Sequence, residues 1–426
     1  MKWRTFCDRV GGPPGPDLQF CHYPGTVEVQ EDPNEERVSM GKKLARILIL
    51  TEGIRGHLFQ SRGIAYWLSG KTGAEIREFQ VPRLKGWDRF WQLKVIARFI
   101  PAMDHPSLKK WISRAGGEGL LLRIREDLFS SGVKPEQCLL ISAGSNPARY
   151  NLALGKLLGI RTCVLMTPSL LGTEPFDFAI LPRHDAPSES PNILETLGAP
   201  NFIDREKLKT EAEKLSTYYA PGKSTEKWAI LIGGDDANYL LGPEWAQSVI
   251  SRIMDLALKA DAELYITTSR RTSPETEQIL KELVHGRTFV KMLLLASESD
   301  LNPVPGMLGL CSRVFCTEDS VSMLSESATA GHEVLLLRTD RKRGWRYVLQ
   351  GFTRFLVETG LLSRSVLWGV PRFDTMIDDF IEKGLIVELP EDLGHWDVPM
   401  IMGTERGLEF NEARRAAQWI LEEWQS

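Results

Sequence analysis

The 426-residue chain, with 42% apolar and 25% charged residues, has an ordinary globular composition, and it is long enough that two domains are expected. Its formal net charge of −4 excludes a general attraction to nucleic acid, so any basic function must be local. No apolar run reaches the ~18 residues of a membrane span, and the first residues lack the apolar region of a secretory signal, which predicts a cytoplasmic protein.

Residues 1–44 are rich in proline, glycine and acidic residues, which favours an irregular N-terminal arm. Cys7, Cys21 and His22 in this arm lack the C-x-x-C spacing that is typical of zinc sites. We therefore expect no metal site in the chain.

Apolar runs alternate with helix-like segments through residues 45–215. The first run, 46–50, leads into a glycine-containing turn and a helix that extends through Trp67. Another helix is expected at 148–158, closed by Gly159. Such alternation is typical of a parallel sheet covered on both faces. The other strand-like runs of this half are 138–143, 161–166 and 177–181.

The alternation restarts after a polar interval at 204–227, with a run at 228–232 that leads into a second glycine turn. Two such openings predict an α/β fold with two Rossmann-like domains, 45–215 and 216–400, facing a cleft. Ligands of open α/β sheets bind outside the carboxyl ends of the strands. The other strand-like runs of the second half are 263–268, 289–295, 313–316 and 333–337.

The final segment, 401–426, contains an amphipathic helix at 407–424. We treat this helix as a separate segment after the second domain, with the hypothesis that it crosses back to the N-terminal domain.

Polar residues follow the strand-like run at 313–316. Asp319 and Ser320 come between a strand-like run and a helix, where Asp and Ser favour the N-cap and unpaired N–H groups bind anions. Ser322 and Glu326 are four residues apart and lie on one helix face. The hydroxyl suits a phosphate and the carboxylate suits a ribose diol. The alternative is a capped helix with a solvated glutamate.

A second polar cluster, Ser269 to Thr272, follows another strand and precedes a helix opened by Pro274. Its adjacent arginines, Arg270 and Arg271, can bind phosphate oxygens in pairs and keep their charge at every physiological pH. The alternative is a solvated turn, but the position at a strand's carboxyl end favours binding.

Gly233 and Gly234 follow the first strand of the second half and precede Asp235. Glycines at a strand end allow the backbone to approach a ligand closely. The motif is neither G-x-G-x-x-G nor a Walker sequence, so it supports neither a dinucleotide site nor an ATPase.

Four residues at strand ends of the N-terminal half are candidate general bases. Glu52 and His57 follow the first strand, and His184 and Asp185 follow a later one. The alternative is that the histidine only caps a helix, and the sequence does not decide among the four.

Residues 82–116 interleave basic and aromatic side chains, which is typical of a segment at an anionic membrane surface. The alternative is an aromatic stripe that faces the core, with a solvated basic face. No nucleic-acid-binding motif accompanies the segment. The candidate membrane or acceptor residues are Lys85, Trp87, Arg89, Trp91, Lys94, Arg98 and Trp111.

These motifs resemble the family of the plant mitochondrial-fission "elongated mitochondria" protein and its bacterial relatives, which are often labelled nucleoside-diphosphate-sugar epimerases. Two motifs are specific in this order: Ser-Arg-Arg-Thr at 269–272 and Asp-Ser-Val-Ser-Met-Leu-Ser-Glu at 319–326. The departures are Phe59, where a polar residue is common, and Ser327, which replaces an alanine. The other matching stretches are 56–60, 176–185, 192–198 and 230–235.

The resemblance implies a glycosyltransferase-B-like fold whose C-terminal half is similar to nucleotide-sugar sites. In related transferases a glutamate on the equivalent helix holds the ribose, which points to Glu326. The candidate nucleotide-sugar-binding residues are Gly233, Gly234, Asp235, Ser269, Arg270, Arg271, Thr272, Asp319, Ser320, Ser322, Met323 and Glu326.

The leading hypothesis is transfer of a sugar from a nucleotide-activated donor to a lipid or cell-envelope acceptor. Helix N-termini and arginines stabilise the leaving diphosphate in such folds, so neither a metal nor a cofactor is expected. The protein would be cytoplasmic or peripheral at the inner membrane face. The alternatives are a non-catalytic adaptor at a membrane surface and an epimerase, and the epimerase lacks the dinucleotide glycine pattern.

Overall fold

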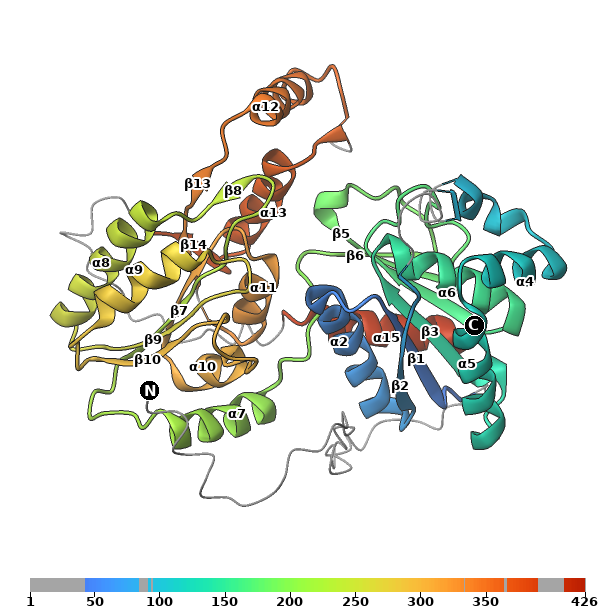
Figure 1. The fold of residues 1–426 in the computed structure, drawn as a ribbon, viewed down its shortest axis with the longest axis horizontal. Coiled ribbons are helices and arrows are strands. Elements are labelled where there is room, and N and C mark those ends of the chain that lie inside the picture. The colour runs from blue at the N-terminus through green and yellow to red at the C-terminus, as the bar shows by residue number, and fades with distance from the viewer. Residues whose placement is uncertain are drawn as a thin grey trace. The chain divides into compact units, whose positions relative to one another are not determined.

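The computed structural model describes residues 43–83, 91–92, 95–332, 334–363, 366–389 and 410–425. Apart from residues 43 and 44, the predicted N-terminal arm lies outside the described residues. Two parallel sheets organise the described chain (Figure 1).

The first sheet has six strands in the order β2-β1-β3-β4-β5-β6, and every neighbouring pair is parallel. Its inner strands are continuous apolar runs because both faces of the sheet are covered. The strands are β1 Arg46–Thr51, β2 Glu75–Gln80, β3 Cys138–Ala143, β4 Arg161–Leu165, β5 Phe178–Pro182 and β6 Ile193–Thr196.

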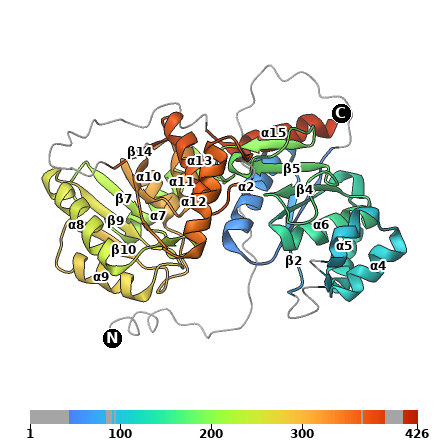
Figure 2. The same cartoon turned by 90° about the horizontal axis from the view of Figure 1, so that it is seen from above.

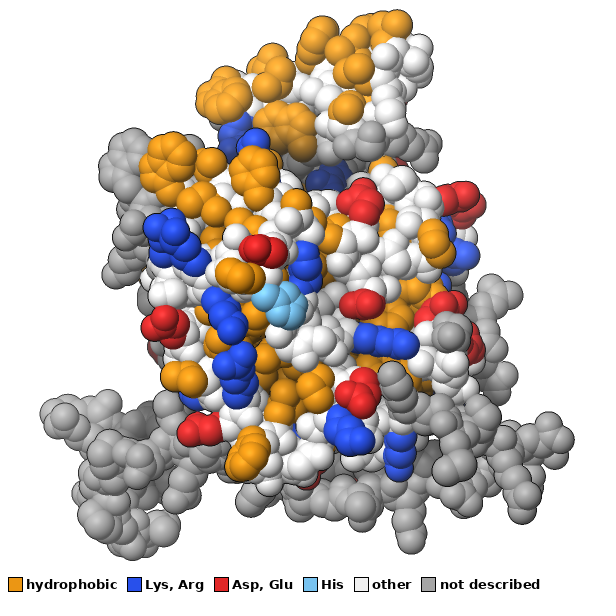
Figure 3. Space-filling model, turned by 90° about the vertical axis from the view of Figure 1, so that its right-hand side faces the viewer, with side chains coloured by type: hydrophobic (Ala, Val, Ile, Leu, Met, Phe, Trp, Pro, Cys, Tyr) orange, Lys and Arg blue, Asp and Glu red, His pale blue; other side chains and the backbone are white. Residues whose placement is uncertain are grey.

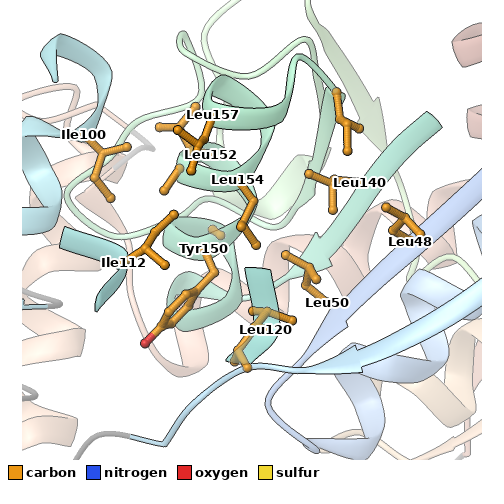
Figure 4. Close-up of a cluster of buried hydrophobic side chains, with 14 of the residues drawn as sticks. Leu48, Leu50, Ile100, Ile112, Leu120, Leu140, Tyr150, Leu152, Leu154 and Leu157 are labelled. Atoms are coloured by element: carbon orange, nitrogen blue, oxygen red, sulfur yellow. The ribbon is translucent and has the colours of Figure 1, made fainter. Parts of the chain in front are cut away.

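Alternate residues of β1 enter two different cores. Leu48 and Leu50 point toward Leu140 of β3 and Leu154 of α6 on one face (Figure 4). Ile47, like Ile49, packs on the other face against α2 and α15. The helices of this half are α2 Arg55–Thr72, α4 His105–Arg114, α5 Glu118–Ser131 and α6 Ser145–Leu158, with short 3-10 helices η2 Ile96–Ala102, η3 Pro135–Gln137 and η4 Arg183–Asp185.

The second sheet also has six strands, in the order β10-β9-β7-β11-β12-β14, again with parallel neighbours. One face packs on α8 and α9, and the other on α7, α10, α11 and α13. The strands are β7 Lys227–Leu231, β9 Glu263–Thr267, β10 Val290–Leu294, β11 Arg313–Thr317, β12 Val334–Leu337 and β14 Ile386–Glu388. The helices are α7 Arg205–Tyr218, α8 Pro243–Lys259, α9 Pro274–Val284, α10 Val304–Leu310, α11 Val321–Thr329 and α13 Val370–Glu382.

A short antiparallel pair, β8 Tyr239–Leu240 with β13 Asp340–Arg341, leads into helix α12 Trp345–Glu358. Figure 1 shows α12 beyond α13, at a distance from the second sheet.

The predicted α/β fold class with two parallel sheets is confirmed. The inner strands match the predicted runs to within a residue or two. In the two six-stranded sheets, the strands that the sequence did not indicate, β2, β6 and β14, are edge strands, and the short pair of β8 and β13 was not indicated either. β2 is largely exposed and carries no continuous apolar run, because only one neighbour and little of the core contact it.

Two helices pack on the half of the chain that does not contain their sequence neighbours: α7 departs from the predicted boundary at 215, whereas α15 crosses back to the first half as the sequence suggested. Helix α7, mostly within the predicted 45–215 unit, packs in the core of the second sheet through Leu208 and Leu215. The C-terminal helix α15 Glu412–Gln425 packs on α2 and on Phe178 of β5 in the first half (Figure 2). Its small residues Ala413 and Ala417 allow this close approach.

Candidate functional site

The three predicted polar motifs of the C-terminal half lie at one edge of the second sheet. Strands β9, β7 and β11 are neighbours in that order and run parallel. Their carboxyl ends therefore place the Ser269–Thr272 turn, the Gly233–Gly234 pair and Asp319 side by side.

The carboxylate of Asp319 joins the three strand ends. Its Oδ2 accepts a hydrogen bond from the Gly234 N–H at 2.9 Å and from Arg271 Nη2 at 2.6 Å. Arg271 Nη1 also donates to the Gly234 carbonyl at 2.8 Å, and the Gly233 N–H donates to Thr317 Oγ1 at 2.8 Å. The Asp319 side chain is fully buried. Burial raises the pKa of Asp319, and the Arg271 guanidinium opposes that rise.

The two glycines are required by this network. A Cβ on Gly233 would lie 2.1 Å from Asp319 Oδ2, and a Cβ on Gly234 would lie 2.1 Å from the carbonyl carbon of Arg271. From the sequence we interpreted Gly233 and Gly234 as positions where the backbone approaches a ligand closely. In the structure it is the protein's own carboxylate and backbone that occupy this space.

The two adjacent arginines face different surroundings. Arg271 is held by Asp319, whereas Arg270 pairs with the exposed carboxylate of Asp300. Arg270 also lines a pocket of about 430 Å³ beside the ends of β9 and β10. The other lining residues of this pocket are Ser269, Thr272, Glu277, Ala296, Ser297, Glu298, Ser299 and Asp300.

Helix α11 begins directly after Asp319, with Ser320 at its N-cap. The Ser320 side chain makes no capping hydrogen bond, so the hydroxyl does not satisfy the helix's own N–H groups. Ser322, Met323 and Glu326 are half-buried on this helix.

The Glu326 carboxylate makes no hydrogen bond or ion pair with any residue in the described part of the chain. Burial raises the pKa of Glu326 to about 7, and the nearby ammonium of Lys207 opposes the rise. Lys207 lies on α7 with its Nζ 3.5 Å from the centroid of the Phe202 ring. That ring stacks on Phe59 of α2, with 5.3 Å between centroids.

Lys207 and Phe202 were not among the sequence candidates. They lie in or beside the polar interval between the two alternating patterns, and no motif marks them.

The four candidate bases form two separate groups. At the end of β1, Glu52 Oε1 lies 3.5 Å from His57 Nδ1, and Asn146 Nδ2 donates to Glu52 Oε2 at 3.3 Å. Burial lowers the pKa of His57, and the Glu52 carboxylate opposes the fall. Gly144, at φ 86°, is needed here because a Cβ would lie 2.7 Å from the His57 ring.

His184 and Asp185 are engaged by helix α13. Arg372 pairs with Asp185 Oδ1 and donates to the His184 carbonyl at 2.9 Å, while Thr167 Oγ1 donates to Asp185 Oδ2 at 2.7 Å. Burial lowers the pKa of His184 to about 4; Asp185 opposes the fall and Arg372 adds to it. Both carboxylate oxygens of Asp185 are thus occupied.

The candidate membrane segment is divided between core and surface. Trp111 is buried in the first core, where its ring packs 5.4 Å from that of Tyr150, so this side chain reaches no membrane. Trp91 and Arg98 are exposed. Lys85, Trp87, Arg89 and Lys94 lie outside the described residues.

Among the described residues, no cluster of three or more His, Cys, Asp or Glu side chains is placed to hold a metal ion. In the same part of the chain, every helix is too short or too polar to cross a bilayer.

Residues 55–424 match the model of a family described as Mitochondrial fission ELM1. No curated protein matches the sequence significantly.

Solved structures of similar fold are remote. UDP-GlcNAc 2-epimerase from Neisseria meningitidis, bound to UDP-GlcNAc, is 12% identical, with a TM-score of 0.39 over 79% of this chain and 99% of its own. A family 9 glycosyl transferase from Veillonella parvula is 13% identical, with a TM-score of 0.41 over 82% and 99%. The glycosyltransferase SnogD from Streptomyces nogalater is 13% identical, with a TM-score of 0.40 over 89% and 94%. Similarity this remote assigns neither a ligand nor an activity to the chain.

We predict that Asp319→Ala lowers the free energy of unfolding by about 1–3 kcal/mol, because the buried Gly234 N–H loses its acceptor and Arg271 its partner. Asp300→Ala is the matched control. It removes an exposed partner of Arg270 and should cost less than about 1 kcal/mol in urea unfolding. Equal effects of the two substitutions would show that Asp319 does not hold the strand ends together.

Proposed function

The chain belongs to the mitochondrial fission ELM1 family, and we propose that it binds a nucleoside-diphosphate sugar and transfers the sugar to a lipid or cell-envelope acceptor. The donor occupies the carboxyl edge of the second sheet. The acceptor is held by the N-terminal half.

The observation that carries this proposal is the unpartnered carboxylate of Glu326. The buried acids Glu318 and Glu277 of the same half have partners: Glu318 pairs with Arg338 and Arg341, and Glu277 accepts from Thr268 and Ser297. Removing a carboxylate from water without a hydrogen-bond partner is costly, and the half-buried Glu326 lies in this state on a helix at the strand ends. Two hydroxyls of a ribose would supply the missing hydrogen-bond donors.

The diphosphate is placed at the start of α11. Its unpaired N–H groups and the Ser320 and Ser322 hydroxyls form a site suited to an anion. Arg270 is the arginine available to the phosphates, because its pairing with Asp300 is exposed and weak. Arg271 keeps its structural partner. These groups stabilise the leaving diphosphate, so the proposal requires no metal.

His57 is the proposed base. Its lowered pKa keeps the ring neutral near pH 7, as a base requires. Glu52 faces Nδ1 and would stabilise the imidazolium, which leaves Nε2 to take the proton of the acceptor hydroxyl. The acceptor oxygen forms a bond to the sugar C1 as the bond from C1 to the diphosphate oxygen breaks. The nucleoside diphosphate leaves with that electron pair.

The second candidate function is that of a non-catalytic adaptor at a membrane surface, because the family description names mitochondrial fission and not sugar transfer. This function needs neither Glu326 nor His57.

We predict that the affinity for a nucleoside-diphosphate sugar rises roughly tenfold between pH 6 and pH 8. The diol stabilises the ionised carboxylate, so the pKa of Glu326 is lower in the complex than its value of about 7 in the unbound protein. Binding therefore releases a proton below pH 7 and becomes insensitive to pH above it. Calorimetry on a panel of donors measures this, since both phosphates of these ligands carry constant charge in the range.

Glu326→Gln is the matched variant, and it should bind more weakly and without this pH dependence. If Glu326→Gln binds donor with the same pH dependence as wild type, the Glu326 carboxylate is not part of the donor site. Absence of binding by wild type to every donor at any pH would leave the adaptor function.

We further predict that His57→Gln lowers the release of nucleoside diphosphate by about 10²–10⁴-fold with donor affinity unchanged. The control is His184→Gln, because His184 is engaged by α13 and is not the proposed base. If His184→Gln loses turnover and His57→Gln does not, His184 is the general base and His57 is not.

A further inference from the structure

Helix α12 carries its apolar face outward. Large apolar side chains recur at spacings of three and four residues, so they lie on one face of the helix. Their exposed fractions run from 44% to 74%, and Figure 3 shows hydrophobic side chains gathered over this helix at the top of the molecule. The side chains are Trp345, Val348, Leu349, Phe352 and Phe355.

The opposite face of α12 is polar and meets the rest of the protein. Gln350 is buried, and its Nε2 donates to Asn238 Oδ1 at 3.0 Å. Arg354 Nη1 lies 3.5 Å from Asp374 Oδ2. An amphipathic surface helix ordinarily turns its apolar stripe to the core, and α12 does the reverse.

Contacts of Gln350 keep the helix in this orientation. A Cβ on Gly369 would lie 2.0 Å from Gln350 Nε2, so the glycine makes room for the polar side chain. Rotating α12 to bury its apolar face would expose Gln350 and separate Arg354 from Asp374. The outward stripe is thus a consequence of specific contacts.

Positive charge borders the exposed stripe. Residues 341–358 contain five basic side chains and a single acidic one, Glu358, in the sequence. Arg341 and Lys342 face inward to Glu318 and Asp235. Arg343 and Arg346 are exposed, and the Arg346 guanidinium lies over the Trp368 ring, 5.3 Å from its centroid. The apolar stripe continues in the residues after the helix, where Leu361, Leu362 and Val366 are exposed.

We propose that α12 is the surface by which this protein lies on an anionic membrane. The helix would lie parallel to the bilayer, with its Trp, Phe and Leu side chains between the headgroups and the acyl chains. Arg343 would contact a lipid phosphate, and Arg346, stacked on Trp368, would add positive charge beside it. A contiguous apolar stripe of this kind is unfavourable in water, and its basic border is complementary to an anionic surface.

This surface is distinct from the 82–116 segment, in which Trp111 belongs to the core. The inference does not depend on sugar transfer, because α12 contributes no residue to the proposed donor site or base.

The test is co-sedimentation of the full chain with vesicles of phosphatidylcholine alone and of phosphatidylcholine mixed with phosphatidylglycerol. Wild type should bind the anionic vesicles, and added salt should weaken the binding. Phe352→Ser with Phe355→Ser should reduce binding at least tenfold. The matched control is Leu122→Ser with Phe129→Ser, which replaces two exposed apolar side chains of α5 and should leave binding unchanged.

A second readout is quenching of tryptophan fluorescence by brominated lipid, which should be smaller in Trp345→Phe than in wild type. Wild type that binds no vesicle would overturn the proposal, as would vesicle binding that survives the α12 changes. A dimer of wild type that the α12 changes convert to a monomer, without vesicle binding, would make the stripe an interface between copies and also overturn it.

Donor binding measured on the same variants separates the two proposals. The α12 changes should leave donor affinity unaltered, whichever way the vesicle experiment turns out.

Discussion

The buried carboxylate of Asp319 is the interaction on which the C-terminal half's strand edge depends. It holds the backbone of the Gly233–Gly234 turn on one side and the guanidinium of Arg271 on the other, and it is the last residue before the N-cap of α11. Because Arg271 is committed to this contact, its neighbour Arg270 is the arginine that faces an open pocket. The same contact fixes where α11 begins, and therefore where Glu326 lies.

The two halves place chemically different groups at their strand ends. The C-terminal half has hydroxyls, helix N–H groups and the unpartnered carboxylate of Glu326, which suit a nucleotide. The N-terminal half has the pair of Glu52 and His57, which suits proton transfer. His184 and Asp185 have the residue types of a base, but their contacts with Arg372 make them part of the attachment of α13.

The sequence predicted the parts of the fold that burial determines. Inner strands such as β1 and β3 are continuous apolar runs because both faces are covered, and these runs were found. The exposed edge strand β2 lacks that pattern. The placement of Ser269–Thr272 beside Asp319 followed from parallel strand ends.

The internal use of Arg271 was not predictable, because it depends on a partner 48 residues away in the chain. The orientation of α12 could not be predicted from the sequence for a related reason. An apolar stripe predicts a buried face, and only the contacts of Gln350 with Asn238 show which side is inward. Likewise, the sequence could not show that His184 and Asp185 differ from Glu52 and His57. The difference depends on Arg372, which contacts Asp185 from 187 residues further along the chain.

The most direct measurement is a crystal structure of the chain with a nucleoside diphosphate bound. We predict that the ribose hydroxyls donate to the Glu326 carboxylate and that the diphosphate lies on the first turn of α11, with the contact between Asp319 and Arg271 intact. A nucleotide bound in the pocket beside Ser269 and Asp300 without touching α11, or one held by Arg271 after release from Asp319, would contradict this assignment.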